Sequence, residues 1–235
     1  MIFSIADKLK NVRARIQKAT ITAKKKPDSV QVLAVTKTRS AEILHEAMKA
    51  GLYQFGENYV SEALAKQNAL KCLCSEQEFA NLTWHFIGPI QSNKTRLIAE
   101  NFAWVQTLER PKIVQRLNEQ RPSELAPLNC CIQVNIDLEE TKSGTSLNEV
   151  ESLAREINAA KNLCLRGLMC IPSASHNEED LKVAFKRMAE KYESLKAIYP
   201  TVDTLSMGMS GDIESAIECG STMVRVGSAL FGERV

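Results

Sequence analysis

Eight short apolar stretches, each followed by a helical pattern, constrain the fold of this chain more than any other feature. The stretches are rich in β-branched and large apolar residues, as strands are, and lie at 30–36, 52–55, 83–87, 102–106, 129–136, 164–171, 202–206 and 222–226. Helical patterns separate them, near 40–50, 59–72, 91–100, 111–120, 146–159, 179–198 and 211–219. Such alternation predicts a parallel sheet, and eight strands favour its closure into a (β/α)8 TIM-type barrel.

A doubly wound open sheet is the alternative fold. It would normally carry a glycine-rich dinucleotide-binding turn after its first strand, but Lys37-Thr38-Arg39-Ser40 stands there instead. Before the first strand, apolar residues spaced four, three and four apart from Ile5 to Ile16 predict an additional N-terminal helix. Because no flexible linker or internal repeat divides the chain, we expect one domain over residues 1–235.

Composition and charge exclude several classes of protein. Lys and Arg number 30 against 28 Asp and Glu, a net charge of +2, which lacks the basic excess of a general nucleic-acid binder. No apolar run approaches the ~18 residues of a membrane span, and charged residues from Asp7 onward interrupt any secretory segment. The 7 cysteines and 3 histidines show no metal-ligand spacing. We therefore expect a soluble cytoplasmic protein without a metal.

Functional residues of a barrel of this kind lie at the carboxyl ends of its strands. The first strand ends in Lys37, whose charge is costly to bury without a partner. One interpretation is an amine with a lowered pKa that suits Schiff-base formation. The other is a lysine whose ammonium simply extends to the solvent at the rim. This residue alone does not decide between them.

The last two strands end where barrels commonly bind phosphate. Small residues in SMGMSGD at 206–212 would let the backbone approach an anion, although Ser210 or Asp212 could equally be an ordinary helix N-cap. In the eighth strand Arg225 shares a face with Met223, and Gly227-Ser228 offers further donors. These features together predict an anion site built from Ser210, Arg225, Gly227 and Ser228.

Other polar residues fall at the same predicted rim. Asn58 follows the second strand and could contact a ligand or cap the next helix, whereas His85 fits a hydrogen-bonded core histidine better than a catalyst. Gln133 and Asn135 share one face of the fifth strand and predict a barrel mouth that handles a polar ligand. A lysine amine, a phosphate site and an arginine on one rim fit pyridoxal 5′-phosphate (PLP).

The sequence resembles the pyridoxal phosphate homeostasis protein family, single-domain relatives of the N-terminal barrel of alanine racemases. The resemblance covers nearly the whole chain and rests on AVTKT at 34–38, FGENY at 55–59, WHFIGPIQSNK at 84–94, RGLM at 166–169, SMGMSGD at 206–212 and VRVG at 224–227. It implies that Lys37 carries the covalent aldimine of PLP, and that Ser210, Gly227 and Ser228 hold the phosphate. It also implies that Arg225 faces the pyridine nitrogen and that Asn58 lies beside the cofactor.

The chain departs only mildly from the family pattern. Thr36 and Arg39 stand where relatives often have Ser and Lys, and Arg39 could change the electrostatics near Lys37. Arginine cannot readily give a proton to the ring nitrogen, so the bound ring would be a poor electron sink. We also expect no second domain to supply the opposing tyrosine of alanine racemases, and Tyr59 is the tyrosine nearest the rim.

We therefore predict a PLP-binding protein with little or no turnover, a monomer or weak dimer. It would hold the cofactor reversibly, buffer it, and supply apo PLP-dependent enzymes, thereby affecting amino-acid and keto-acid metabolism. Two enzyme hypotheses stay open: a PLP-dependent racemase or lyase of unknown substrate, and a barrel aldolase or isomerase that uses Lys37 on a sugar phosphate without cofactor. A regulatory module that binds protein partners is compatible with the main interpretation.

Overall fold

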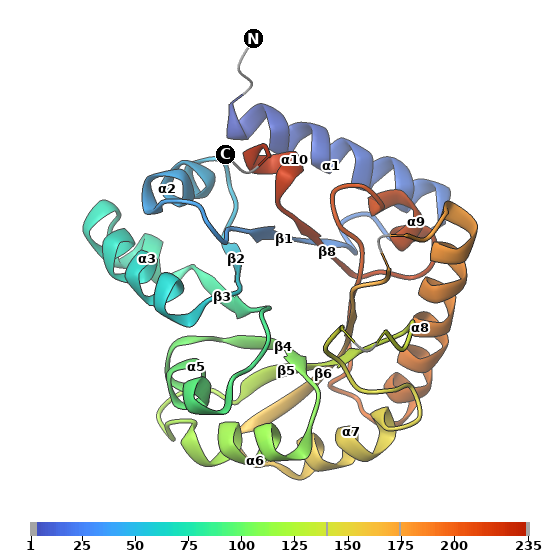
Figure 1. The fold of residues 1–235 in the computed structure, drawn as a ribbon. Helices are drawn as coiled ribbons and strands as arrows, with labels where there is room; N and C mark the ends of the chain where they lie inside the picture. The colour runs from blue at the N-terminus through green and yellow to red at the C-terminus, as the bar shows by residue number, and fades with distance from the viewer. Residues whose placement is uncertain (1–3, 140, 174, 234–235) are drawn as a thin grey trace.

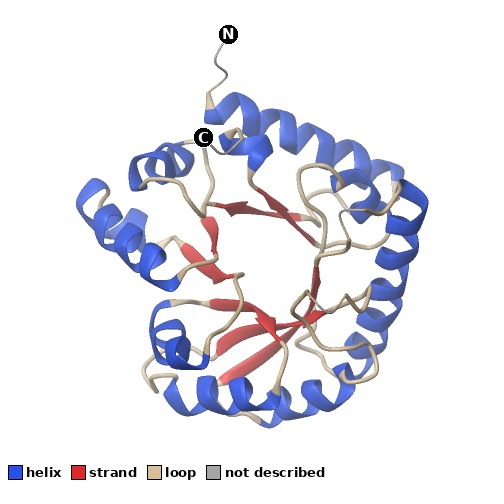
Figure 2. Cartoon of the chain, viewed as in Figure 1, coloured by secondary structure: helices blue, strands red, loops and turns tan. Residues whose placement is uncertain are grey.

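The computed structural model describes residues 4–139, 141–173 and 175–233 and has the predicted barrel at its centre. Eight parallel strands form one closed sheet in chain order, with β8 paired to β1, and helices surround the ring (Figures 1 and 2). The strands are β1 Gln31–Val35, β2 Gln54–Glu57, β3 Thr83–Phe86, β4 Trp104–Leu108, β5 Leu128–Val134, β6 Leu163–Cys170, β7 Thr204–Ser206 and β8 Met223–Val226. All eight predicted strands are confirmed, and the open sheet is wrong.

The helices of the described chain follow the predicted order with two additions. They are α1 Ile5–Thr22, α2 Ala41–Lys49, α3 Val60–Leu73, α4 Glu76–Ala80, α5 Thr95–Asn101, α6 Pro111–Gln120, α7 Val150–Ala159, α8 Glu178–Ile198, α9 Ile213–Glu218 and α10 Ser228–Phe231, with a 3-10 turn η1 at Ser92–Lys94. Neither α4 nor α10 was predicted. A capping box between Ser75 and Glu78 stabilises the start of α4, and this Ser-x-x-Glu spacing is visible in the sequence.

The helix predicted over 146–159 begins later than expected, at Val150. The Glu149 carboxylate accepts hydrogen bonds from the main-chain N–H and the hydroxyl of Ser146, at 3.0 and 2.7 Å. These bonds fold residues 146–149 into a turn that precedes the helix. Local side-chain bonding of this kind competes with helical hydrogen bonds.

The N-terminal helix α1 packs across the end of the chain, next to α9 and α10 (Figure 1). A capping box between Ser4 and Asp7 begins it, and Leu9, Val12 and Ile16 form its buried face. From its outer side Arg15 donates to both carboxylate oxygens of Glu214 at 2.7 Å and to the main-chain oxygen of Ser210 at 2.9 Å. The predicted extra helix is thus present, and it holds the loop that follows β7.

Part of the barrel interior beside β1 is apolar. Leu33, Ile87 and Met223 form a small buried cluster. A Cβ atom at Gly56 would lie 2.9 Å from Ile87 and 3.3 Å from Leu33, so glycine gives these side chains room.

Across the described ranges, no helix has the length and apolar character needed to cross a membrane. Those same ranges contain no cluster of His, Cys, Asp and Glu suited to a metal ion.

Candidate functional site

A cavity of about 400 Å³ opens at the carboxyl ends of the strands. Its walls come from the loops after β1, β2 and β7, from β8 and from the start of α10. All six predicted site residues border it: Lys37, Asn58, Ser210, Arg225, Gly227 and Ser228. The closure of the barrel explains this meeting of distant residues, because β8 pairs directly with β1 and places Val226 opposite Ala34.

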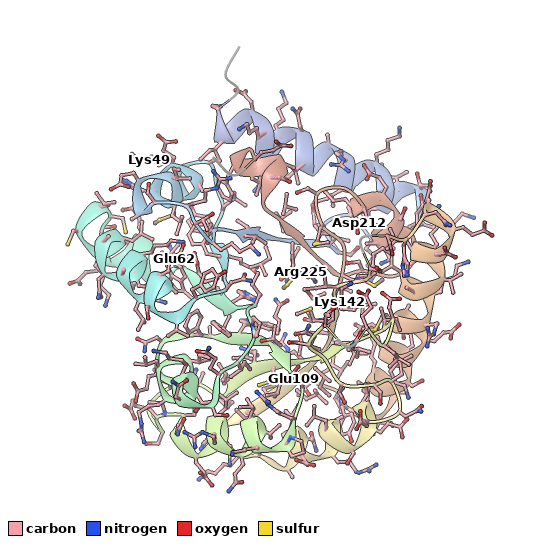
Figure 3. All side chains as sticks on the ribbon, in the orientation of Figure 1. Lys49, Glu62, Glu109, Lys142, Asp212 and Arg225 are labelled. Atoms are coloured by element: carbon pink, nitrogen blue, oxygen red, sulfur yellow. The ribbon has the colours of Figure 1, made fainter. Side chains whose placement is uncertain are left out.

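Arg225 forms the buried floor of this cavity, and Figure 3 shows it near the middle of the barrel. Its side chain is fixed by main-chain and hydroxyl oxygens: Nη1 donates to Ser206 O at 2.8 Å, and Nη2 donates to Cys170 O at 2.8 Å. No carboxylate pairs with this guanidinium within the described chain. Burial lowers its pKa, but an arginine stays protonated at neutral pH. The cavity therefore has a cationic floor.

A chain of buried side chains supports Arg225 from inside the barrel. Ser206 Oγ accepts from Arg225 Nη1 at 2.9 Å and donates to Gln106 Oε1 at 2.7 Å. The Gln106 amide nitrogen then lies 3.0 Å from His85 Nδ1, which acts as the acceptor when the proton is on Nε2. Burial lowers the pKa of His85 to about 3, which keeps the ring neutral. His85 is thus a hydrogen-bonded core residue.

The loop after β7 turns sharply before α9. Gly208 has φ +95°, and a Cβ there would lie 2.6 Å from the Cβ of Ala216, so glycine is required. Ser210 Oγ accepts from the main-chain N–H of Ala229, at 3.2 Å, and joins this loop to α10. Asp212 stands at the N-cap position of α9, but its carboxylate accepts from the N–H of Met209 instead of capping the helix. Burial raises the pKa of Asp212.

Asn58 is positioned by a close approach of two loops. A Cβ at Gly88 would lie 2.2 Å from the main-chain oxygen of Asn58, so another residue there would displace it. Thr107 holds Gly88 by donating to its carbonyl at 2.6 Å. Asn58 precedes α3 but makes no capping bond in the described structure, where its buried Oδ1 has no hydrogen-bond partner. The capping interpretation of Asn58 therefore does not hold, and the ligand contact stays a prediction.

Gln133 and Asn135, the residues from which a polar barrel mouth was predicted, make other contacts. Neither borders the cavity; both hold the loop between β5 and α7. The Gln133 amide donates to Ser143 O at 2.9 Å, and the Asn135 amide donates to Glu139 O at 2.8 Å and Lys142 O at 3.1 Å. Polar residues at a strand end can bond loop carbonyls as well as ligands. The alternation of polar and apolar residues in the sequence does not distinguish the two roles.

Several residues that line the cavity were not predicted as site residues, among them Arg39, Ile171 and Met209. Arg39 donates to the main-chain oxygens of Gly232 and Glu233, at 2.6 and 3.1 Å, and closes the cavity against the C-terminal segment. Ile171 directly follows β6, so its place at a strand end is the signal that could have found it. Met209 lies inside the motif at 206–212, where the small and polar residues carried the prediction of an anion site.

Fold and cavity together define a class: a (β/α)8 barrel whose mouth combines a lysine, a buried arginine and loops suited to an anion. Residues 8–235 match the family model described as alanine racemase, N-terminal domain. The pyridoxal phosphate homeostasis protein of Haemophilus influenzae is 48% identical over 233 residues, covering 98% of this chain and 96% of that protein. That of Escherichia coli K12 is 48% identical over 231 residues, covering 98% and 97%. The chain belongs to the pyridoxal phosphate homeostasis protein family, within the alanine racemase N-terminal domain group.

Solved structures agree with this assignment. PipY of Synechococcus elongatus PCC7942, in its structure with PLP bound, is 31% identical and has a TM-score of 0.82, covering 97% of this chain and 100% of PipY. The alanine racemase of E. faecalis is 16% identical, with a TM-score of 0.68, covering 95% of this chain and 58% of the racemase. At that identity the likeness shows the fold alone.

Proposed function

We propose that this protein binds PLP reversibly at the described cavity and thereby buffers and supplies the cofactor inside the cell. One observation carries the proposal: Lys37 borders the same cavity as Ser210, Gly227 and Ser228, above the buried guanidinium of Arg225. The names of relatives that match over nearly their whole length support it, as does the PLP-bound structure of PipY.

Each group of PLP has a matching group in the cavity. The aldehyde would condense with the Lys37 amine, forming a carbon–nitrogen double bond and releasing the aldehyde oxygen as water. Ser210 and the Gly227-Ser228 corner would hold the phosphate, which also suits the cationic floor. Arg225 uses three of its five N–H donors on Ser206 and Cys170, so another can meet the lone pair of the pyridine nitrogen. Asn58 Oδ1, without a partner in the described chain, would lie beside the cofactor.

The surroundings favour binding over turnover. PLP supplies an electron sink when its ring nitrogen carries a proton, and arginine is too weak an acid to provide one. A racemase needs a second base on the opposite face of its substrate. Among the described residues at the cavity there is no tyrosine and no histidine. Tyr59, which the sequence places nearest the rim, is 59% exposed and borders a neighbouring cavity with Pro89, Gln91 and Lys94.

The proposal is tested by a spectroscopic titration. Purified protein should turn yellow with PLP and lose the colour on prolonged dialysis against a competing amine, because the linkage is reversible. In deuterated solvent, common amino acids should show no steady-state α-proton exchange. Robust racemisation, transamination or decarboxylation would overturn the proposal in favour of a PLP-dependent enzyme. A protein that stays colourless with PLP but turns over sugar phosphates would support the cofactor-independent aldolase or isomerase.

Supply to apo-enzymes is the second part of the proposal. An apo PLP-dependent enzyme mixed with the loaded protein should recover activity at a rate that either equals or exceeds recovery from the same concentration of released PLP. A higher rate that depends on the concentration of the loaded protein indicates directed transfer. An equal rate indicates supply by mass action. Failure to reactivate the enzyme at all would contradict a role in supply.

A further inference from the structure

Two side chains of α3 hold the main chain on both sides of Lys37. The Lys66 ammonium donates to the carbonyl oxygen of Thr36 at 2.7 Å. One helical turn earlier, the Glu62 carboxylate accepts from the main-chain N–H of Thr38 at 2.5 Å. The residue between these peptide groups is Lys37. Figure 3 shows Glu62 on α3, beside the barrel.

The Lys66 ammonium is fully satisfied where it lies. It is 6% exposed and also contacts Glu57 Oε1 at 2.8 Å and Glu62 Oε1 at 2.6 Å, so each of its three N–H donors has an acceptor. Glu57 is fully buried and accepts a further bond from the Thr36 hydroxyl, at 2.6 Å. A buried ammonium held in this way is a structural cation and not a second amine for an aldehyde.

The backbone that Glu62 holds is in an uncommon conformation. Thr38 has φ +65°, in the left-handed region that β-branched residues rarely adopt. Such residues persist where their surroundings hold them, and here an ionised acceptor bonds the N–H of the residue itself. The chain therefore turns at a defined point directly after Lys37, instead of continuing along the direction of β1.

We infer that Glu62 and Lys66 are positioning residues for Lys37, fixing its main chain so that the amine faces the cavity opposite Ser210 and Gly227. This inference rests on the proposed function. Neither residue borders the cavity, so neither contacts the cofactor there. Their effect is limited to the step in which the Lys37 amine meets the aldehyde. Fixing a reacting group in advance removes orientational entropy from that step.

The test compares two ligands that differ only at the reacting carbon. PLP carries the aldehyde, whereas pyridoxine 5′-phosphate carries an alcohol there and can make only the phosphate and ring contacts. Glu62→Ala should weaken PLP binding and slow formation of the yellow linkage, each by about tenfold, and leave pyridoxine 5′-phosphate binding within about twofold of wild type. Glu62→Gln should restore most of the loss, because its amide oxygen still accepts from Thr38.

Two further variants complete the set. Lys66→Met should give the same selective loss for PLP, accompanied by a lower melting temperature because Glu57 loses its buried partner. If that variant does not fold, the Glu62 pair decides the question by itself. Lys71→Ala is the matched control, since Lys71 lies on the same helix but is exposed and near Phe79. It should behave as wild type with both ligands.

The outcomes are distinguishable. Wild-type rates of linkage in Glu62→Ala, or an equal loss of both ligands in the variants, would overturn the positioning role; the second result would mean that α3 merely supports the fold. Failure of the wild type to form any linkage with PLP would overturn the proposed function itself, and the inference with it. Selective loss of PLP binding with rescue by Glu62→Gln would establish the role.

Discussion

A single nitrogen of Arg225 donates to both oxygens of Ser206, to the carbonyl at 2.8 Å and to the hydroxyl at 2.9 Å. The hydroxyl in turn donates to Gln106, so the orientation of the guanidinium is set from within the barrel. Ser206 and Gln106, which do not border the cavity, therefore position the arginine at its floor. A similar arrangement serves Lys37 at the end of the neighbouring strand β1, where Glu62 and Lys66 hold the main chain on either side of it.

Removal of the Ser206 hydroxyl should therefore cost stability. Ser206→Ala leaves one buried N–H donor of Arg225 and an acceptor of Gln106 without a partner, and we expect a loss of about 1–3 kcal/mol in the free energy of unfolding. Denaturant unfolding measures it. Ser194→Ala is the control, because Ser194 is exposed and bonds only its own helix, and it should change stability by less than about 0.5 kcal/mol. Equal effects of the two substitutions would contradict this account of Arg225.

Substitution by alanine should destabilise the protein at one glycine near the cavity and leave stability unchanged at another. Gly88→Ala would place a methyl carbon 2.2 Å from the Asn58 carbonyl oxygen, whereas nothing lies within 4 Å of a Cβ at Gly211. We expect Gly88→Ala to destabilise the protein by about 2 kcal/mol or more, and Gly211→Ala to leave stability within about 0.5 kcal/mol. Thermal unfolding of the two variants without ligand compares them directly. Unchanged stability of Gly88→Ala would contradict this expectation and would show that the main chain at Asn58 shifts at little cost.

His85 gives the protein a component of acid sensitivity. Its folded pKa of about 3 lies below the unfolded value of 6.5, because burial disfavours the charged ring. Its contribution is fully present above pH 6.5 and is lost as the pH falls toward 3, by up to about 1.4 kcal/mol per pH unit. His85→Gln, compared with a His45→Gln control, should flatten the decline of unfolding free energy between these pH values. A decline as steep as in wild type would show that His85 does not titrate in this way.

The contact of Arg15 with the loop after β7 should affect the ligand more than the fold. Arg15 and Glu214 are both about 40% exposed, so their ion pair adds less than about 1 kcal/mol to stability. Arg15→Ala also frees the Ser210 carbonyl, and we expect inorganic phosphate and PLP to bind about two- to fivefold more weakly. Arg13→Ala, which loses a bond to Gly51 instead, serves as the control. Identical affinities in the two variants would exclude a role of α1 in holding the loop.

The sequence predicted the barrel because periodicity and alternation are properties of contiguous segments. It also predicted the residues at strand ends, since closure of eight strands brings the first and last ends together. It could not reveal that Gln133 and Asn135 bond loop carbonyls, because nothing local distinguishes such an amide from one that binds a ligand.

Contacts between separate elements could not be predicted from the sequence either. Glu62 and Lys66 on α3 bond the main chain on either side of Lys37, at the end of β1. In the sequence, α3 has only the pattern of an ordinary charged helix. The fixed rotamer of Arg225 depends on residues from three other strands. These relationships arise from packing in three dimensions and carry no periodic signal.

The central claim is that the Lys37 amine is the group that bonds PLP in this cavity. Borohydride reduction of the PLP-loaded protein, followed by peptide mass mapping, tests it most directly, in wild type and in Lys37→Ala. We predict that the wild-type label lies on Lys37 alone, and that Lys37→Ala takes up no label while still binding pyridoxine 5′-phosphate. Stoichiometric label on another lysine such as Lys66, or undiminished labelling of Lys37→Ala, would contradict the account.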